Sequence, residues 1–361
     1  MLYTKRNPGR ARSPPDRRER AEGSMSLTTT SSEAREKARR SGVVARRVQA
    51  YSILVAWAIL ILVFTLLLPD TFLTVQNFTA IANSKTATVL LTLGLIFALS
   101  AGEFDLSIGA SLSLGAAVPA WLYTAHGVPV MVGIAIALLC AVLFGLLNGV
   151  LSVRYNIPSL VVTLGSGTAL IGLVAGLVGN STISIKGDWW NDFLTHRTFG
   201  LYTSFWLVLV IAFIIWYVLQ HTPIGRHLYF VGQGREVARL AGIQVNAYRY
   251  SSLMISATLG AMAGAMLLGN TGAVQARVGQ AFILAAFAAA FLGSTAIVPG
   301  RFNAWGTVVA VYFIETGITG LQLLGFQAWV SDVFYGTALV VGVLVATLAT
   351  RLRSRLSARS T

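Results

Sequence analysis

Residues 130–152 read VMVGIAIALLCAVLFGLLNGVLS, 23 residues without one charged side chain. A helix that crosses a bilayer needs about 20 consecutive, mostly apolar residues, so this stretch predicts a transmembrane helix. The whole chain has a similar character, because 55% of its 361 residues belong to the set AVILMFWYC and only 11% are charged. Charged residues make up about a quarter of an ordinary soluble domain. The composition therefore argues against a soluble two-domain enzyme and predicts an all-α, polytopic membrane protein.

Further apolar stretches lie on both sides of this one, separated by polar residues, glycine or proline. The expected spans, about ten in number, are residues 48–68, 80–101, 107–124, 130–152, 158–179, 202–219, 250–269, 280–297, 304–324 and 330–350. Lys and Arg indicate the orientation, because cytoplasmic segments hold an excess of them. With a cytoplasmic amino terminus, inner segments carry 23 Lys and Arg and outer segments carry four. We therefore expect both termini to be cytoplasmic.

The net charge of +14 comes mostly from residues 1–47, which hold 13 Lys and Arg against five acidic residues. Arg, Ser, Pro and Thr dominate this segment, so it cannot bury enough surface to offset its ordering entropy. We expect a disordered, basic cytoplasmic tail beside anionic lipid, not a nucleic-acid-binding arm. Residues 48–350 then form the transmembrane domain, and residues 351–361 form a second basic cytoplasmic tail. Met25 offers an alternative start of translation.

Acidic side chains interrupt the apolar sequence at membrane depth. Glu103 and Asp105 lie in AGEFDLSIGAS, and Glu315 lies beside Thr316 in YFIETGITG, near the middle of the ninth span. Such residues cost ~2.5 kcal/mol or more on insertion scales, and they usually face the bundle interior or a cavity. Transporters bind substrate near the midplane, so these four residues are candidates for a substrate pathway. The structural alternatives are a helix cap at Asp105 and an interhelical hydrogen bond at Glu315.

Two connecting segments are long enough to do more than join spans. On the predicted inner side, residues 236–243 read EVARLAGI, a short amphipathic helix with glycines on both sides. Its spacing suits either the membrane surface or a groove of another protein, and does not choose between them. On the outer side, residues 180–201 contain Trp189 and Trp190 among acidic residues. Tryptophan there suits the lipid headgroups or contact with a partner.

Small residues recur at helical spacing within the spans. The GxxxG pairs are Gly145 with Gly149, Gly172 with Gly176, and Gly260 with Gly264. Such pairs let helix backbones approach closely, and we expect tight packing within one bundle more than a specific dimer face.

The motifs of common catalytic and metal sites do not occur in the sequence. There is no GxxxxGK[ST] phosphate loop, no HExxH and no calcium loop, and the four histidines share no ligand spacing. A single cysteine, Cys140, excludes an internal disulfide. We therefore expect no catalytic residue, no metal and no cofactor in this chain.

Several segments carry a more specific signal when they are taken in order. They are GEFDLSIGASLSLGA, NGVLSVRYNIPSLVVTLGSGTAL, GRHLYFVGQGREVARLAGIQVNAYRY, LGSTAIVPGRFNAWGT and TGITGLQLLGF. Together they resemble the permease subunits of ribose- and xylose-type monosaccharide ABC importers, over about residues 50 to 350. The resemblance implies a multi-pass permease in a bacterial inner membrane, a transport subunit and not an enzyme.

The resemblance also implies partners and residue roles. A second permease copy, giving a homodimer, would complete the pathway, a separate ATPase subunit would hydrolyse ATP, and an extracytoplasmic binding protein would deliver sugar. Asn148, which opens the second segment, joins the candidates for the substrate pathway. The third segment would couple to the ATPase, with contacts at Gly232, Gly234, Glu236, Arg239, Leu240, Gly242 and Ile243.

Departures from the family pattern leave the substrate open. Glu103 and Phe104 replace the usual glycine and apolar residue before Asp-Leu-Ser, and Glu315 adds an acid at membrane depth. Ribose, xylose, arabinose and galactose are the candidate sugars, with branched-chain amino acids or nucleosides as alternatives. A different class, an ion-coupled secondary transporter, would use Glu315 and Glu103 as proton carriers.

Overall fold

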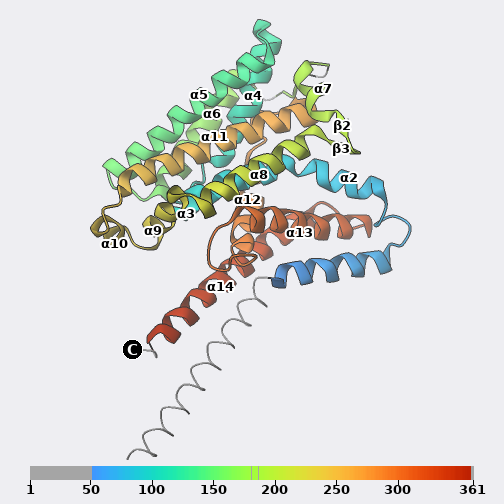
Figure 1. The fold of residues 1–361 in the computed structure, drawn as a ribbon. Helices are drawn as coiled ribbons and strands as arrows, with labels where there is room; N and C mark the ends of the chain where they lie inside the picture. Colours follow the sequence, from blue (N-terminus) through green and yellow to red (C-terminus); the bar gives the residue numbers. More distant parts are fainter. Residues whose placement is uncertain (1–50, 180, 186, 359–361) are drawn as a thin grey trace, which may run out of the picture. The chain divides into compact units, whose positions relative to one another are not determined.

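Apolar helices make up most of the structure, a computed structural model that describes residues 51–179, 181–185 and 187–358 (Figure 1). The predicted tail at residues 1–47 lies outside this range. Eight helices in the described part are long and apolar enough to cross a membrane, and two shorter apolar helices are Tyr51–Leu67 and Gln280–Gly293. Every predicted span thus contains an apolar helix. The all-α membrane fold is confirmed, whereas the number of crossings and the side of the termini stay predictions.

The helices follow one another with short connections. Their bounds are α2 Val75–Ser84, α3 Thr86–Ser100, α4 Ile108–His126, α5 Val130–Gly149, the π-helix η1 Val150–Arg154, α6 Ser159–Val178, α7 Trp189–Thr195, α8 Thr203–His221, α9 Pro223–Gln233, α10 Arg235–Leu240, α11 Val245–Thr271, α12 Gln280–Gly293, α13 Ala304–Leu323 and α14 Trp329–Ala358. Two short antiparallel pairs join β1 Ile183–Ser184 to β4 Ala273–Val274, and β2 Arg197–Thr198 to β3 Leu201–Tyr202.

Helices α3 and α11 form the centre of the bundle. Every residue of α3 except Ser100 is buried, as expected of a helix that is apolar all round. Helix α11 packs against α3, α4 and α5. At Gly264 an added Cβ atom would lie 2.0 Å from the Leu112 carbonyl oxygen, so only glycine permits this approach of α11 to α4.

The three GxxxG pairs have different surroundings. Added Cβ atoms at Gly145, Gly149 and Gly260 would come within 3.1 Å of neighbouring helices, as at Gly264, so tight packing within the bundle is confirmed for two pairs. The expectation is wrong for Gly172 and Gly176, because no atom lies within 4 Å of a Cβ atom added at either position. Helix α6 therefore presents an open face of small residues.

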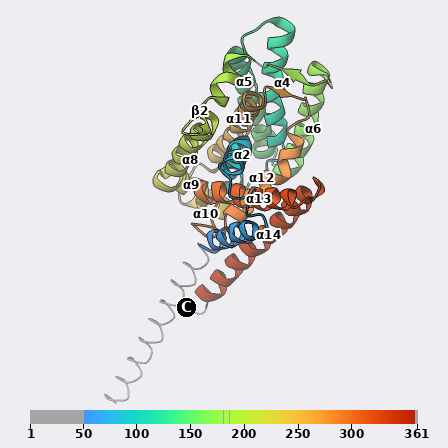
Figure 2. The ribbon, with the colours of Figure 1, turned by 90° about the vertical axis from the view of Figure 1, so that its right-hand side faces the viewer.

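The connecting segments collect at the two ends of the bundle. Helices α9 and α10 lie at one end of α11, and α7 lies at the other (Figure 1), and Figure 2 shows α9 and α10 side by side from a second direction. Helix α7 is held there by Trp190 Nε1, which donates to the Ala265 carbonyl at 2.8 Å, and by Asn191, which donates to the Gly269 carbonyl at 2.6 Å. The structure thus separates the segments that the charge pattern assigned to opposite sides.

The second span begins earlier than its hydropathy predicts. Helix α2 starts at Val75, after Thr74 accepts a hydrogen bond from the Asn77 backbone, and the chain bends at Lys85 before α3. The polar residues of VQNFTAIANSK hid this helix from a search for apolar runs. Lys85 therefore lies within the continuous range Val75–Ser100, not in a loop.

Candidate functional site

Residues 101–107, here called the break, interrupt the helical path between α3 and α4. Gly102 has a φ of 75°, a left-handed conformation that favours glycine. Asp105 is 1% exposed, and both of its oxygens accept hydrogen bonds. Oδ1 accepts from the Ser107 backbone at 3.0 Å and from the Ser107 hydroxyl at 2.5 Å, and Oδ2 accepts from Ser256 on α11 at 2.6 Å. Asp105 thus ties the start of α4 to α11.

Glu103 is the second buried acid of the break, at 1% exposure. Its Oε1 atom accepts hydrogen bonds from Arg249 Nε and, at 2.9 Å, from Arg235. Arg249 is buried as well, and also donates to the Ser152 carbonyl of η1 at 3.3 Å. A buried charge requires a charged or hydrogen-bonding partner, and this carboxylate has two cations.

Helix α6 holds the backbone of the break. The Phe104 N–H donates to Ser159 Oγ at 3.0 Å, and the Leu106 N–H donates to Thr163 Oγ1 at 3.1 Å. The Thr163 hydroxyl also lies 2.9 Å from the Phe104 carbonyl oxygen. The first two turns of α6 therefore fix the position of the break.

Asn148 belongs to the same cluster. Its amide nitrogen donates to Ser107 Oγ at 3.0 Å, and its amide oxygen accepts from Ser166 at 2.6 Å. The structure thus links two of the five predicted pathway residues, Asp105 and Asn148, through Ser107, and places Glu103 in the same break with its own bonds to Arg235 and Arg249. Glu315 and Thr316 lie elsewhere, on α13.

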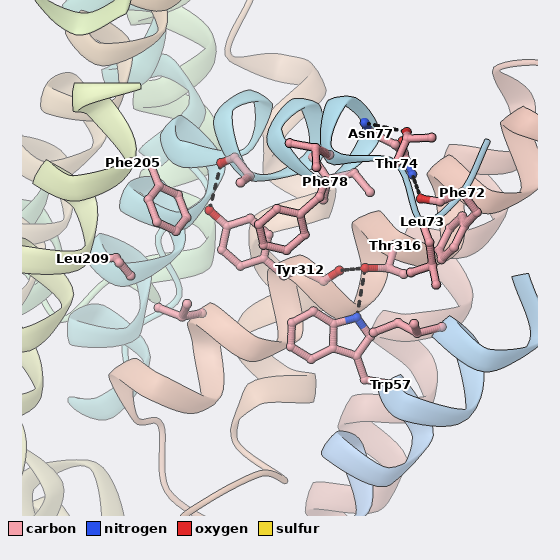
Figure 3. A pocket seen from close by; sticks show the side chains of 15 residues that line it. Trp57, Phe72, Leu73, Thr74, Asn77, Phe78, Phe205, Leu209, Tyr312 and Thr316 are labelled. Atoms are coloured by element: carbon pink, nitrogen blue, oxygen red, sulfur yellow. Dashed lines mark hydrogen bonds between the residues drawn. The ribbon is translucent and has the colours of Figure 1, made fainter. Parts of the chain in front are cut away.

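Thr316 lines a pocket of about 490 Å³ between the helix Tyr51–Leu67, α2, α8 and α13, here called the aromatic pocket (Figure 3). Trp57 Nε1 donates to Thr316 Oγ1 at 2.9 Å, and the Tyr312 hydroxyl donates to the Ala82 carbonyl at 3.1 Å. The aromatic residues of the lining are Trp57, Phe72, Phe78, Phe205 and Tyr312. A largely apolar wall with a few polar groups is typical of small-molecule sites.

Glu315 does not line the aromatic pocket. Its Oε2 atom lies 3.1 Å from Lys85 Nζ, at the bend between α2 and α3. The Glu315 side chain is 11% exposed and the Lys85 side chain 25%. Both predicted α13 residues thus make interhelical contacts, Glu315 with Lys85 and Thr316 with Trp57.

Helix α10 presents its apolar residues to the outside. Leu240 is 90% exposed and Val237 is 70% exposed, whereas Ala238 between them is buried against Val231 and Val245. The Glu236 and Arg239 side chains form an exposed ion pair at 3.2 Å on the same helix. The predicted helix at residues 236–243 is thus present, one residue earlier at its start, and ends before Gly242, which has a φ of 78°.

The segment before α10 is helical too, which was not predicted. Helix α9 starts with Pro223 in its first turn, a position that proline favours, so the Thr222–Pro223 pair could have indicated the start of this helix. Gly232 in its last turn packs on the break, because an added Cβ atom would lie 2.1 Å from the Ser100 carbonyl oxygen. Ile243 follows α10 and packs against the buried cluster that contains Ala238.

The partners of Glu103 were also missed. Arg235 and Arg249 are among the 23 Lys and Arg counted as inner, and Lys85 is among the four counted as outer. Glu103 itself indicated these partners, since an acid inside an apolar run needs a cation or hydrogen-bond donors nearby. No group of three or more His, Cys, Asp or Glu that could hold a metal ion occurs in the described residues.

The family described as "Branched-chain amino acid transport system / permease component" matches residues 77–354 of the chain. The chain belongs to this family. It is 26% identical over 294 residues to the ribose import permease protein RbsC of Haemophilus influenzae, covering 80% of this chain and 90% of that protein. It is 28% identical over 295 residues to the D-allose transport system permease protein AlsC of Escherichia coli, covering 81% and 90%.

A third relative is the autoinducer 2 import system permease protein LsrD of Enterobacter sp. (strain 638), 29% identical over 266 residues, which cover 72% of this chain and 81% of that protein. No solved structure matches the chain. The family and the apolar helices together make this chain a multi-pass protein of the cell membrane.

Proposed function

We propose that this chain is the permease subunit of an ATP-binding cassette importer for a monosaccharide. Two of the relatives above are named for ribose and D-allose, which favours a sugar over the branched-chain amino acids of the family description. Residues 48–350 form the transmembrane permease domain. A separate ATPase subunit supplies the energy, and an extracytoplasmic binding protein delivers the sugar. The family match disfavours the ion-coupled secondary transporter.

The exposed tip of α10 is the observation that carries this proposal. Leu240 is 90% exposed and, unlike the exposed leucines of the candidate spans, lies on a short helix outside them, so it is suited to fill a groove on another protein. Gly232 and Ala238 are packed, so the segment has a fixed position from which Leu240 projects. We assign α9, α10 and the following turn to the cytoplasm and to contact with the ATPase.

Substitution of Leu240 tests this assignment. Leu240→Asp should abolish co-purification of the ATPase subunit and ATP hydrolysis stimulated by the loaded binding protein, because an interface anchor often contributes a few kcal/mol. Phe199→Asp is the matched control, since Phe199 is 92% exposed but lies between β2 and β3 at the other end of the bundle. Full stimulated hydrolysis in the Leu240 variant would show that α10 only lies on the membrane.

We assign Glu315 and Thr316 to the substrate pathway. Thr316 lines a pocket with aromatic walls, and Glu315 is a largely buried carboxylate whose ion-pair partner among the described residues, Lys85, is 25% exposed. A carboxylate accepts hydrogen bonds from sugar hydroxyls. For Glu103, Asp105 and Asn148 the geometry favours positioning, because Glu103 Oε1, both Asp105 oxygens and both amide atoms of Asn148 already bond to the protein.

The open face of α6 supports a second permease copy. Gly165, Gly172 and Gly176 have no neighbours within 4 Å of an added Cβ atom, and small residues at this spacing allow close helix association in membranes. Gly176→Cys, on a Cys140→Ala background, should form a disulfide-linked dimer upon oxidation. Cysteine at Leu143, an exposed position on α5, is the control and should not.

A further inference from the structure

The segment of α9 and α10 is joined to the break by charge as well as by backbone packing. Arg235, the first residue of α10, donates to Glu103 Oε1 at 2.9 Å. The Arg235 side chain is 41% exposed, whereas that of Glu103 is 1% exposed. One ion pair therefore runs from the surface of the segment to a carboxylate inside the bundle.

A second cation holds the same carboxylate from the inside. Arg249 on α11 donates to the oxygen that also accepts from Arg235, and its side chain is only 7% exposed. If Arg235 moves away, Glu103 keeps Arg249, and no buried charge is left without a partner. The contact with Arg235 can therefore open and close while the rest of the cluster stays intact.

Glu103 is also connected to α6, through backbone hydrogen bonds of the break. Glu103 is bonded through the backbone to Phe104 and Leu106, whose N–H groups donate to Ser159 and Thr163 in the first turns of α6. Helix α6 is also the helix whose small residues form the open face. A displacement of the break therefore acts directly on α6.

We infer that Arg235 and Glu103 are positioning residues that transmit movement of α10 to α6 through the break. This inference rests on the proposed function, since the movement would come from the ATPase. It adds a link between α10 and the break that is made by the buried acid Glu103. Neither residue is assigned contact with the transported sugar.

Arg235→Gln tests this inference, because it removes the ion pair between Arg235 and Glu103 and leaves the buried Glu103–Arg249 pair. The measured quantity is monosaccharide imported per ATP hydrolysed, with the permease, ATPase and binding protein in proteoliposomes, for ribose, xylose, arabinose and galactose in turn. This ratio should fall roughly tenfold, the change expected for loss of one charge-assisted hydrogen bond. The ATPase should still co-purify, since Leu240 and Val237 are unchanged.

Arg239→Gln is the matched control. Arg239 is the other arginine of α10, and it pairs with Glu236 on the same helix, so this variant should keep the wild-type ratio. Hydrogen exchange at the Phe104 and Leu106 amides gives a second readout. Nucleotide binding to the ATPase should change this exchange in the wild type and in Arg239→Gln, but not in Arg235→Gln.

The outcomes separate the inference from the proposed function. If the wild-type complex imports none of the four sugars at the expense of ATP, the proposed function fails and the inference fails with it. If the wild type imports sugar and Arg235→Gln keeps both the wild-type ratio and the wild-type exchange response, the importer stands and the link is overturned.

Discussion

The break and the middle of α13 both place acids inside an apolar bundle, but they do so in opposite ways. In the break, Glu103 has two arginines and Asp105 has three hydrogen bonds from serines. On α13, Glu315 has one ion-pair partner, Lys85, which is itself 25% exposed. The first arrangement engages Glu103 Oε1 and both oxygens of Asp105 with donors from the protein, whereas the second gives Glu315 a single described cation and places it beside Thr316, which lines the aromatic pocket.

We infer from this difference that the break and the middle of α13 have different functions. A cluster with several hydrogen bonds to neighbouring helices is rigid and can carry a displacement from one element to the next. A carboxylate with few bonds keeps acceptor sites that a sugar hydroxyl can occupy. Equivalent substitutions in the two regions should therefore have unequal effects on stability, with the larger loss in the break.

The largest difference should appear when each acid is replaced by leucine. Glu103→Leu leaves Arg249 buried without its carboxylate, and breaking a buried pair costs ~3 to 5 kcal/mol. Glu315→Leu leaves Lys85, whose partly exposed side chain can reach a polar environment, so the cost should be about 1 kcal/mol or less. Thermal unfolding of the two purified variants in the same detergent measures this difference. Equal shifts in Tm for the two variants would contradict different functions for Glu103 and Glu315.

Gly232, in the last turn of α9, and Gly234, between α9 and α10, provide a pair of substitutions only two residues apart. An alanine Cβ atom at position 232 would clash with the Ser100 carbonyl oxygen at 2.1 Å, whereas at position 234 the nearest atom, Val237 Cγ2, lies at 3.8 Å. Gly232→Ala should therefore destabilise the contact with the break by ~1 to 3 kcal/mol, and Gly234→Ala should not. Limited proteolysis of the segment measures its detachment. Equal protection in both variants would show that the segment does not dock on the break.

Hydroxyl groups provide a milder test of the same contrast. Thr163→Val leaves the Leu106 N–H unpaired, which should cost ~1 to 3 kcal/mol. Thr316→Val removes the acceptor for Trp57 Nε1 beside an open pocket, where water can replace it, so the cost should be about 1 kcal/mol or less. Urea or thermal unfolding monitored by tryptophan fluorescence distinguishes the two. A larger loss at Thr316 would reverse the expected order.

Much of the fold could be predicted from the sequence, because a membrane imposes long apolar helices with recognisable ends. The break was visible as well, since AGEFDLS interrupts an apolar run at Gly102. The partners within it were not, because Glu103 meets Arg235 and Arg249 across 132 and 146 residues of chain. Pairing over such separations depends on how α3, α10 and α11 pack, and hydropathy and local spacing carry no information about that packing.

Lys85 shows the same limit at the other site. Its charge counted as an outer residue when orientation was inferred from Lys and Arg, yet the structure places it at a bend within a span and beside Glu315. The sequence correctly singled out Glu315 and Thr316 as polar residues inside an apolar helix. It could not show that they contact different helices, with Thr316 beside Trp57 and Glu315 beside Lys85.

The smallest effect on stability, with a clear effect on function, is expected for Glu315→Gln. Glutamine keeps the size of the side chain and can still accept a hydrogen bond from Lys85, so unfolding should change by about 0.5 kcal/mol, the scale of one weak ion pair. Transport should nevertheless fall several-fold, because a neutral amide accepts weaker hydrogen bonds from sugar hydroxyls than a carboxylate does.

Lys85→Gln separates two explanations for such a loss of transport. If Glu315 contacts the sugar, Lys85→Gln frees the carboxylate and preserves or improves apparent affinity, whereas if the ion pair only holds α13 against the bend, both variants lose transport equally. Initial uptake rates of the complete importer at several sugar concentrations decide between them, and unchanged kinetics in Glu315→Gln would remove Glu315 from the substrate pathway.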